Sequence, residues 1–234
     1  MQDLSRIFDK WRNEQEKSFR IIAFGSSNTE LSWWSKGRHN WVDWLYINAR
    51  AAIGRNVVVI NQGISGETTR QLLDRINRDV LSFQPSMVII TIGGNDSMKG
   101  MTLAQYIENL RRICLIIREN DGLPVLQTYY CPVYDEGPEG FEALFSQFVQ
   151  ANRDLSKELG LPLIDQYKIL EPFYKNNKEE YKKIMRDWIH VNYLGNFIMG
   201  LNASRALGLP DLEIPEDIEH DIKYLLGRIQ EYGK

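Results

Sequence analysis

Short, continuous apolar runs alternate with longer stretches of helical periodicity along this chain, and this alternation limits the folds open to it. The apolar runs contain few polar positions, which is typical of strands covered on both faces of a sheet. The strand–helix order therefore predicts an α/β protein, with a parallel sheet between two layers of helices. The predicted strands are residues 20–24, 57–61, 87–92, 125–128 and 163–165, and the main predicted helices are 41–52, 69–81, 103–119 and 141–159.

Chain length and the two terminal segments predict one domain. With 234 residues, of which 43% are hydrophobic, the chain can form one sizeable core. We expect a single domain over residues 1–234, with peripheral amphipathic helices at about residues 1–18 and 216–232. These helices can pack on the core or on a second copy of the chain, so a homo-oligomer stays open.

The charge balance and the lengths of the apolar runs argue against several partners. The 28 basic and 31 acidic residues give a net charge of −3, without the basic patch of a nucleic-acid-binding protein. No apolar run reaches the ~18 residues of a membrane span, and residues 1–19 lack the apolar core of a signal peptide, so we expect a cytoplasmic protein. Cys114 and Cys131 are expected to be free thiols, with no disulfide or zinc site.

Polar, glycine-rich segments follow the first three predicted strands. Ser27 follows the first strand, Gly66 the second and Asn95 the third. The carboxyl ends of parallel strands share one edge of the sheet, where ligands bind, so we expect these residues to converge on one crevice. Asp187 and His190 come later, just before a predicted helix, on a loop that can reach the same edge.

These residues supply what a serine ester hydrolase needs. The hydroxyl of Ser27 can attack an acyl carbonyl if a base takes its proton, and His190 has a suitable pKa. Asp187 can hold the imidazole, while the N–H groups of Ser27 and Gly66 and the amide of Asn95 can stabilise the oxyanion. Taken singly, Ser27 and Asn95 could be helix caps, Gly66 a turn glycine and His190 a structural histidine. The combination favours catalysis.

Together, these segments resemble the SGNH (GDSL-like) hydrolases over residues 21–195. The resemblance implies a three-layer α/β/α, flavodoxin-like fold with a five-stranded parallel sheet in the order 2-1-3-4-5. It also implies ester hydrolysis through an acyl-enzyme, without a metal or cofactor, with Ser27, Asp187 and His190 as the catalytic residues and Ser27, Gly66 and Asn95 as oxyanion donors. The matching motifs are FGSSNT at 24–29, NQGISGETT at 61–69, GGND at 93–96 and DWIH at 187–190.

The chain departs from the family pattern beside the nucleophile. The family usually has Asp at the position before it, and here that residue is Ser26. The attacking atom is unaffected, but a carboxylate that would hold neighbouring loops is missing. We expect Ser26→Asp to preserve the fold.

Aromatic residues near the predicted crevice give the clues to the substrate. Trp33, Trp34, Tyr129 and Trp188 are candidates to stack on sugar rings or to line an acyl pocket. We favour a small-molecule ester with a short acyl group, such as acetyl on a carbohydrate, followed by a short-chain lipid ester or thioester. Another class of function is a flavodoxin-like protein that binds the FMN phosphate through residues 25–30. That alternative has no use for Asp187 and His190.

Overall fold

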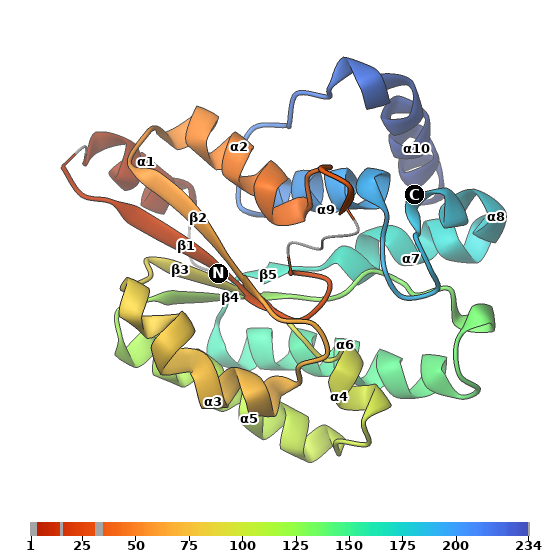
Figure 1. Cartoon of the computed structure of the whole chain (residues 1–234), viewed down its shortest axis with the longest axis horizontal. Helices are drawn as coiled ribbons and strands as arrows, with labels where there is room; N and C mark the ends of the chain where they lie inside the picture. The colour runs from red at the N-terminus through yellow and green to blue at the C-terminus, as the bar shows by residue number, and fades with distance from the viewer. Residues whose placement is uncertain (1–3, 15, 31–34, 234) are drawn as a thin grey trace.

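The computed structural model describes residues 4–14, 16–30 and 35–233, and it contains the expected parallel sheet. The strand order is β2-β1-β3-β4-β5, and all neighbouring strands are parallel (Figure 1). The predicted flavodoxin-like order is therefore confirmed. The strands are β1 (Phe19–Gly25), β2 (Val57–Gly63), β3 (Met87–Thr91), β4 (Leu123–Gln127) and β5 (Leu163–Ile164).

Helices cover both faces of the sheet (Figure 1). One layer contains α1 (Leu4–Asn13), α2 (Trp41–Ile53), α7 (Gln166–Asn176), α9 (Tyr193–Ala206) and α10 (Glu219–Tyr232). The other layer contains α3 (Thr69–Asp79), α5 (Leu103–Glu119) and α6 (Phe141–Leu159). Shorter helices are α4 (Gly94–Met98), α8 (Lys178–Tyr181) and the 3-10 helices Leu81–Phe83, Tyr134–Glu136, Lys182–Ile184 and Glu216–Ile218.

The core consists of two clusters, one on each face of the sheet. In β1, Ile21 and Ala23 belong to one cluster, whereas Ile22 and Phe24 belong to the other. Successive side chains of a strand point to opposite faces, so a strand between two helical layers needs an apolar residue at every position. This geometry explains the continuous apolar runs of the sequence.

Both terminal helices pack on the core of this chain. In α1, Phe8 and Trp11 are buried, and the Trp11 ring stacks on Phe19 with a centroid separation of 4.7 Å. In α10, Ile222 and Leu225 are buried in the same cluster. The apolar faces of the two helices are thus used within the chain.

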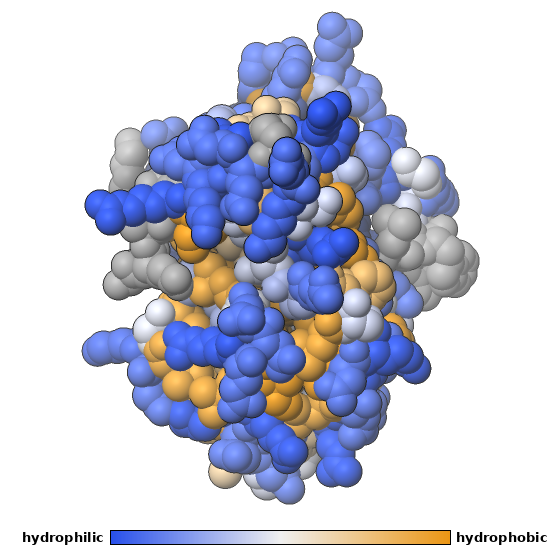
Figure 2. Space-filling view, turned by 90° about the vertical axis from the view of Figure 1, so that its left-hand side faces the viewer, coloured by the Kyte–Doolittle hydropathy of each residue, from blue (hydrophilic) through white to orange (hydrophobic). Residues whose placement is uncertain are grey.

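The surface is hydrophilic over most of the side shown in Figure 2. Hydrophilic residues cover most of the upper part of this view, and hydrophobic residues show in patches between hydrophilic ones in its middle and lower parts. Of the helices in the described ranges, none combines the length and apolar character needed to cross a membrane. A cytoplasmic location stays a prediction.

Candidate active site

Two glycines allow the strand ends beneath the crevice to approach closely. Gly25, at the end of β1, is paired with Gly63 of β2 and with Thr91 of β3. A Cβ on Gly63 would lie 2.1 Å from the backbone nitrogen of Glu30, and one on Gly25 would lie 2.4 Å from the carbonyl oxygen of Thr91. Both positions therefore require glycine because of close packing between backbones.

Ser27 lies in a turn directly after β1. Residues 26–30 form no helix, and the N–H groups of Thr29 and Glu30 both donate to the carbonyl of Ser26 at 2.9 Å. Within residues 26–30, Ser27 is therefore not the N-cap of a helix.

Side chains from two other elements hold this turn in place. Asn40, the N-cap of α2, donates to the Thr29 carbonyl at 3.0 Å, and Asn61 of β2 donates to the same oxygen at 2.6 Å. The indole N–H of Trp41, which is fully buried, donates to the Asn28 carbonyl at 2.8 Å. The nucleophile candidate thus sits on a turn with fixed backbone.

Ser27, His190 and Asp187 form a continuous hydrogen-bonded chain. Ser27 Oγ lies 2.9 Å from His190 Nε2, and His190 Nδ1 lies 2.9 Å and 3.0 Å from the two carboxylate oxygens of Asp187. Asp187 Oδ1 also accepts the backbone N–H groups of Ile189, at 3.0 Å, and of His190, at 2.8 Å. These distances suit proton transfer from the serine hydroxyl to the imidazole.

The surroundings of the histidine favour its neutral form. Burial lowers the pKa of His190, the Asp187 carboxylate opposes this shift, and the charge of Arg186 adds to it, so that the pKa is below its usual value. Burial raises the pKa of Asp187, but the N–H of Ile189 and the His190 ring outweigh it, so this pKa is lowered. A neutral imidazole beside an ionised carboxylate is the state that a general base requires.

The two other residues predicted to stabilise the oxyanion, Gly66 and Asn95, follow β2 and β3. Gly66 has a positive φ of 79°, a conformation that L side chains rarely adopt, and its carbonyl accepts the Lys99 ammonium at 2.5 Å. Asn95 Nδ2 donates to the Glu67 carbonyl at 2.9 Å, which uses one of its two amide hydrogens. Gly66, Asn95 and Ser27 line the same cavity, so all three predicted oxyanion residues come together.

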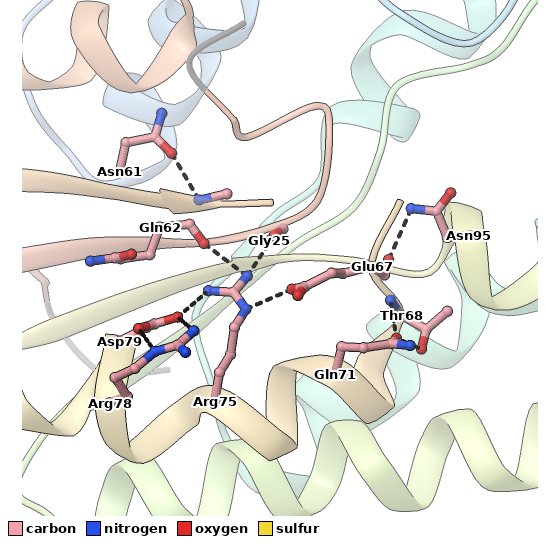
Figure 3. Close-up of polar contacts among 11 residues, drawn as sticks. Gly25, Asn61, Gln62, Glu67, Thr68, Gln71, Arg75, Arg78, Asp79 and Asn95 are labelled. Atoms are coloured by element: carbon pink, nitrogen blue, oxygen red, sulfur yellow. Dashed lines mark hydrogen bonds and ion pairs between the residues drawn. The ribbon is translucent and has the colours of Figure 1, made fainter. Parts of the chain in front are cut away.

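Arg75 of α3 links the loop that carries Gly66 to the ends of β1 and β2 (Figure 3). Its guanidinium Nη2 donates to the carbonyls of Gly25, at 3.1 Å, and Gln62, at 3.0 Å. The Arg75 guanidinium also contacts the carboxylate of Glu67, the residue after Gly66. The backbone carbonyl of Glu67 in turn accepts a hydrogen bond from the Asn95 side chain, as Figure 3 shows.

Ser26 places a hydroxyl where the family usually has the carboxylate of Asp, and this hydroxyl has a hydrogen-bond partner. Ser26 is buried, and its Oγ lies 2.9 Å from Tyr129 Oη. Burial raises the pKa of Tyr129 to about 12, although the hydrogen bond with Ser26 acts in the opposite direction. The phenol therefore stays neutral at physiological pH and links the nucleophile turn to the segment after β4.

Two cavities adjoin Ser27 and His190. The smaller has a volume of about 250 Å³ and contains the predicted oxyanion residues beside Met98, Tyr129 and Phe145. The larger has a volume of about 500 Å³ and shares Ser27, Asn28 and His190 with the smaller. Its lining includes Glu30, Arg38, His39, Val191, Tyr193 and Asn196.

The four aromatic candidates for substrate binding have different outcomes. Tyr129 lines the smaller cavity, as the substrate-binding hypothesis requires. The Trp188 ring packs edge-on against Phe141 at 5.3 Å and lines neither of the two cavities beside Ser27, so its position gives that hypothesis no support. Trp33 and Trp34 lie outside the described residues.

Sequence reasoning missed two residues that shape the site, Arg75 and Tyr130. Arg75 lies three positions after Leu72 and directly before Ile76, so it falls on the apolar stripe of α3. A charged residue at such a position could have indicated a buried ion pair. Tyr130 is fully buried behind the Ser27–His190 contact, and its adjacent position to Tyr129 gave no indication of this role.

Comparisons with known proteins agree with this geometry. The family model "GDSL-like Lipase/Acylhydrolase family" matches residues 23–196, which is more than half of the chain. An uncharacterized lipoprotein of Bacillus subtilis (strain 168) is 30% identical over 172 residues, covering 63% of this chain and 70% of that protein. Thioesterase 1/protease 1/lysophospholipase L1 of Escherichia coli (strain K12) is 30% identical over 142 residues, covering 57% of this chain and 59% of that protein.

The fold also resembles a solved structure. The crystal structure of an acetylxylan esterase from Geobacillus stearothermophilus superposes with a TM-score of 0.70, at 20% sequence identity, covering 85% of this chain and 98% of that one. The structural likeness concerns the fold, whereas the sequence matches identify the family. The chain therefore belongs to the GDSL-like lipase/acylhydrolase family and is a carboxylic ester hydrolase.

Proposed function

We propose that this protein hydrolyses short acyl esters of carbohydrates through an acyl-enzyme on Ser27. The observation that carries the proposal is the contact of 2.9 Å between Ser27 Oγ and His190 Nε2, together with the Asp187 carboxylate on the other ring nitrogen. Nucleophile, base and orienting group are thus in hydrogen-bond contact before a substrate binds.

Acylation follows from these contacts. Ser27 Oγ attacks the ester carbonyl while its proton moves to His190 Nε2, and Asp187 stabilises the imidazolium through Nδ1–H. The carbonyl oxygen becomes an oxyanion, which the N–H groups of Ser27 and Gly66 and the remaining amide hydrogen of Asn95 stabilise. The tetrahedral intermediate collapses, the C–O bond to the alcohol breaks, and His190 returns the proton to the departing alkoxide.

Deacylation repeats these steps with water. The water attacks the acyl-Ser27 carbonyl while His190 takes its proton, and the same donors stabilise the second oxyanion. Collapse releases the carboxylic acid, and the proton on His190 returns to Ser27 Oγ. The depressed pKa of His190 supports this role, since the imidazole is neutral at the start of each half-reaction.

The two cavities support a small acyl group and a larger alcohol. The cavity of about 250 Å³ is lined by the oxyanion residues and by large side chains, among them Met98, Tyr129 and Phe145, so the acyl group would lie there. The cavity of about 500 Å³ offers apolar surface from Val191 and Tyr193 beside the polar groups of Glu30 and Arg38. This mixture suits a sugar, whose ring has apolar C–H faces and hydroxyl edges.

A lipid ester or thioester is the second candidate. Met98 lines the acyl-side cavity and is 42% exposed, so a longer acyl chain could extend across it toward the solvent. The similar protein from Escherichia coli is named as a thioesterase and lysophospholipase. Chain-length preference separates the two candidates.

The test compares substrates and nucleophile variants. The wild type is assayed against acetylated oligosaccharides and against p-nitrophenyl esters of increasing acyl length, beside Ser27→Ala and His190→Ala. We expect acetyl esters to be hydrolysed fastest and both variants to lose the acyl-enzyme route. Full activity in Ser27→Ala would refute the mechanism, and a preference for long acyl chains would favour the lipid alternative.

The same preparation addresses the flavin hypothesis. A phosphate-binding turn leaves the contact of Ser27 with His190 unexplained, whereas hydrolysis uses it. Purified protein that is colourless and hydrolyses p-nitrophenyl acetate supports the esterase. A yellow protein without esterase activity would support flavin binding instead.

A further inference from the structure

The hydroxyl of Tyr130 lies at the meeting point of the two loops that carry Ser27 and His190. Tyr130 Oη is 2.5 Å from Asn28 Oδ1, 2.5 Å from the Ile189 carbonyl oxygen and 3.0 Å from the Val191 backbone nitrogen, which donates to it. Asn28 directly follows the nucleophile, and Ile189 and Val191 flank the histidine. One phenol therefore contacts both sides of the catalytic contact.

The position of this group makes its hydrogen bonds costly to lose. Tyr130 is fully buried, so water cannot replace the phenol without rearrangement. Burial raises the pKa of Tyr130 well above its usual value, which keeps the phenol protonated. Other hydrogen bonds hold this segment within its own loop: the Arg186 N–H donates to the His190 carbonyl at 2.7 Å, and Asp187 Oδ1 accepts the N–H groups of Ile189 and His190. The phenol adds a link from this loop to Asn28 of the nucleophile turn.

The single phenol proton limits which hydrogen bonds Tyr130 can donate. A phenol carries one proton, so it can donate to only one of the two oxygens at 2.5 Å. Turning the Asn28 amide by half a rotation would place its NH₂ group against the phenol oxygen. Asn28 and Val191 would then donate to Tyr130, and Tyr130 would donate to Ile189, so that each of these three contacts has one donor and one acceptor.

We propose that Tyr130 is a positioning residue that sets the separation of Ser27 Oγ and His190 Nε2 by binding both loops through one hydroxyl. The inference rests on the proposed serine-hydrolase function. It explains how a histidine on a separate loop is held 2.9 Å from a hydroxyl 163 positions away in the sequence. Tyr130 acts through its neighbours and transfers no proton in the reaction.

Tyr130→Phe removes the hydroxyl and keeps the ring. The Val191 N–H and the Ile189 carbonyl then lose the phenol, so one link that positions the histidine loop relative to the nucleophile turn is broken. A displacement of about 1 Å between reacting groups can cost about 10²-fold in rate. We expect kcat to fall by about 10- to 100-fold with little change in KM, because the ring that borders the acyl-side cavity remains.

Tyr181→Phe is the matched control. Tyr181 is also fully buried, and its hydroxyl donates to the carbonyl of Cys131, the residue after Tyr130, at 2.5 Å. This hydrogen bond involves neither the nucleophile turn nor the segment from Ile189 to Val191. Tyr130→Phe removes the contacts of the phenol with Asn28, Ile189 and Val191, whereas Tyr181→Phe removes the contact with Cys131, so the decrease in Tm should be larger in Tyr130→Phe. We expect only Tyr130→Phe to lose kcat, whereas Tyr181→Phe keeps the wild-type value within about twofold.

A second readout reports on the nucleophile without a natural substrate. Diethyl p-nitrophenyl phosphate phosphorylates an activated serine and releases p-nitrophenol, so its second-order rate constant measures how well His190 activates Ser27. This rate constant should fall in Tyr130→Phe by the same factor as kcat. A wild type that does not react would refute the proposed function itself. A reactive wild type with an equally reactive Tyr130→Phe variant would overturn this inference alone.

Asn28→Ala tests the same link from the other loop, including the case in which Tyr130→Phe does not fold. It removes the partner on the nucleophile side, and we expect the phosphorylation rate constant to decrease about 10-fold. In the double variant, the two effects should not add, because both substitutions break one connection. Unchanged reactivity in Asn28→Ala, or fully additive losses in the double variant, would contradict the proposal.

Discussion

Arg75 and Glu67 form a buried ion pair beneath the loop that carries Gly66, with Arg75 Nε 2.6 Å from Glu67 Oε2. Their side chains are 5% and 16% exposed, so the pair is largely shielded from water. Because Arg75 also binds the carbonyls at the ends of β1 and β2, the pair connects the predicted oxyanion loop to the strand that leads into Ser27. Glu67 thus has a defined partner at a position where the family commonly has Asp.

Replacing Arg75 should reduce both stability and catalysis. Arg75→Met leaves the Glu67 carboxylate without its partner and the Gly25 and Gln62 carbonyls without their donor. Breaking one side of a buried ion pair typically costs about 3–5 kcal/mol, and we expect a loss near the lower end because Glu67 keeps some exposure. Urea unfolding measures the stability, and kcat on p-nitrophenyl acetate measures the effect on the oxyanion loop.

Arg78→Met is the control on the same helix. Arg78 is 73% exposed and pairs with Asp79, which also contacts Arg75 at 3.2 Å, as Figure 3 shows. The side-chain hydrogen bonds of Arg78 go to Asp79 rather than to the strand ends. We expect nearly unchanged stability and activity in this variant. Equal effects of the two substitutions would mean that the loss does not arise from the buried network.

Much of the fold follows from apolar periodicity. The predicted helices 103–119 and 141–159 coincide with α5 and α6, because each has a capping or turn residue at its start and an apolar stripe on one face. The third helix ends at Asp79 rather than at residue 81, because Val80 leaves helical geometry and Leu81–Phe83 forms a 3-10 helix. Helix ends depend on such local backbone angles, which apolar spacing does not encode.

The catalytic candidates could be predicted from the sequence, whereas the residues that hold them in place could not. Ser27, Gly66 and Asn95 follow neighbouring strands, so the order of elements alone brings them together. Tyr130 contacts Ile189, 59 positions away, and Arg75 contacts Gly25, 50 positions away, and the sequence does not show which buried polar groups will meet. Trp188 shows the same limit, since its position beside His190 did not reveal that its ring packs on Phe141.

Asn95→Ala should lower kcat by about 10²–10³-fold if the amide stabilises the oxyanion. The loss should fall on kcat rather than on KM, because the charge on the oxygen develops only in the transition state. Steady-state kinetics on p-nitrophenyl acetate separates the two parameters. Asn95→Ala also removes the hydrogen bond to Glu67, so circular dichroism and thermal unfolding must show a folded protein. A rise in KM at constant kcat would assign Asn95 to substrate binding instead.

The activity should decrease at acid pH with a midpoint below the usual pKa of histidine. Burial is the main cause that lowers the pKa of His190, and the neutral base therefore persists to lower pH than in a free imidazole. Protonation removes the base, so kcat/KM falls as the pH decreases through this pKa. A profile from about pH 4 to 9 measures the midpoint. A flat profile would contradict a histidine base.

Arg186→Gln should move this acid limb to higher pH. The charge of Arg186 lowers the pKa of His190, and its Nε lies 3.2 Å from Asp187 Oδ2, where it competes with the imidazole for the carboxylate. Removing the charge therefore raises the pKa of His190 by both routes. Arg205→Gln is the control, because Arg205 pairs with Asp211 at the end of α9. An acid limb that moves to lower pH, or moves equally in both variants, would contradict this electrostatic account.

Ser26→Asp should yield a folded protein, despite the burial of this position. The Ser26 hydroxyl already lies 2.9 Å from Tyr129 Oη, and a carboxylate there could accept the phenol proton as a hydrogen bond. Ser26→Ala is the comparison, because it removes the hydroxyl and leaves Tyr129 with one partner fewer. Thermal unfolding and esterase rates of both variants are measured beside the wild type. If Ser26→Asp unfolds while Ser26→Ala remains folded, the buried site cannot accommodate the carboxylate, and the packing of this chain requires a small, uncharged side chain at this position.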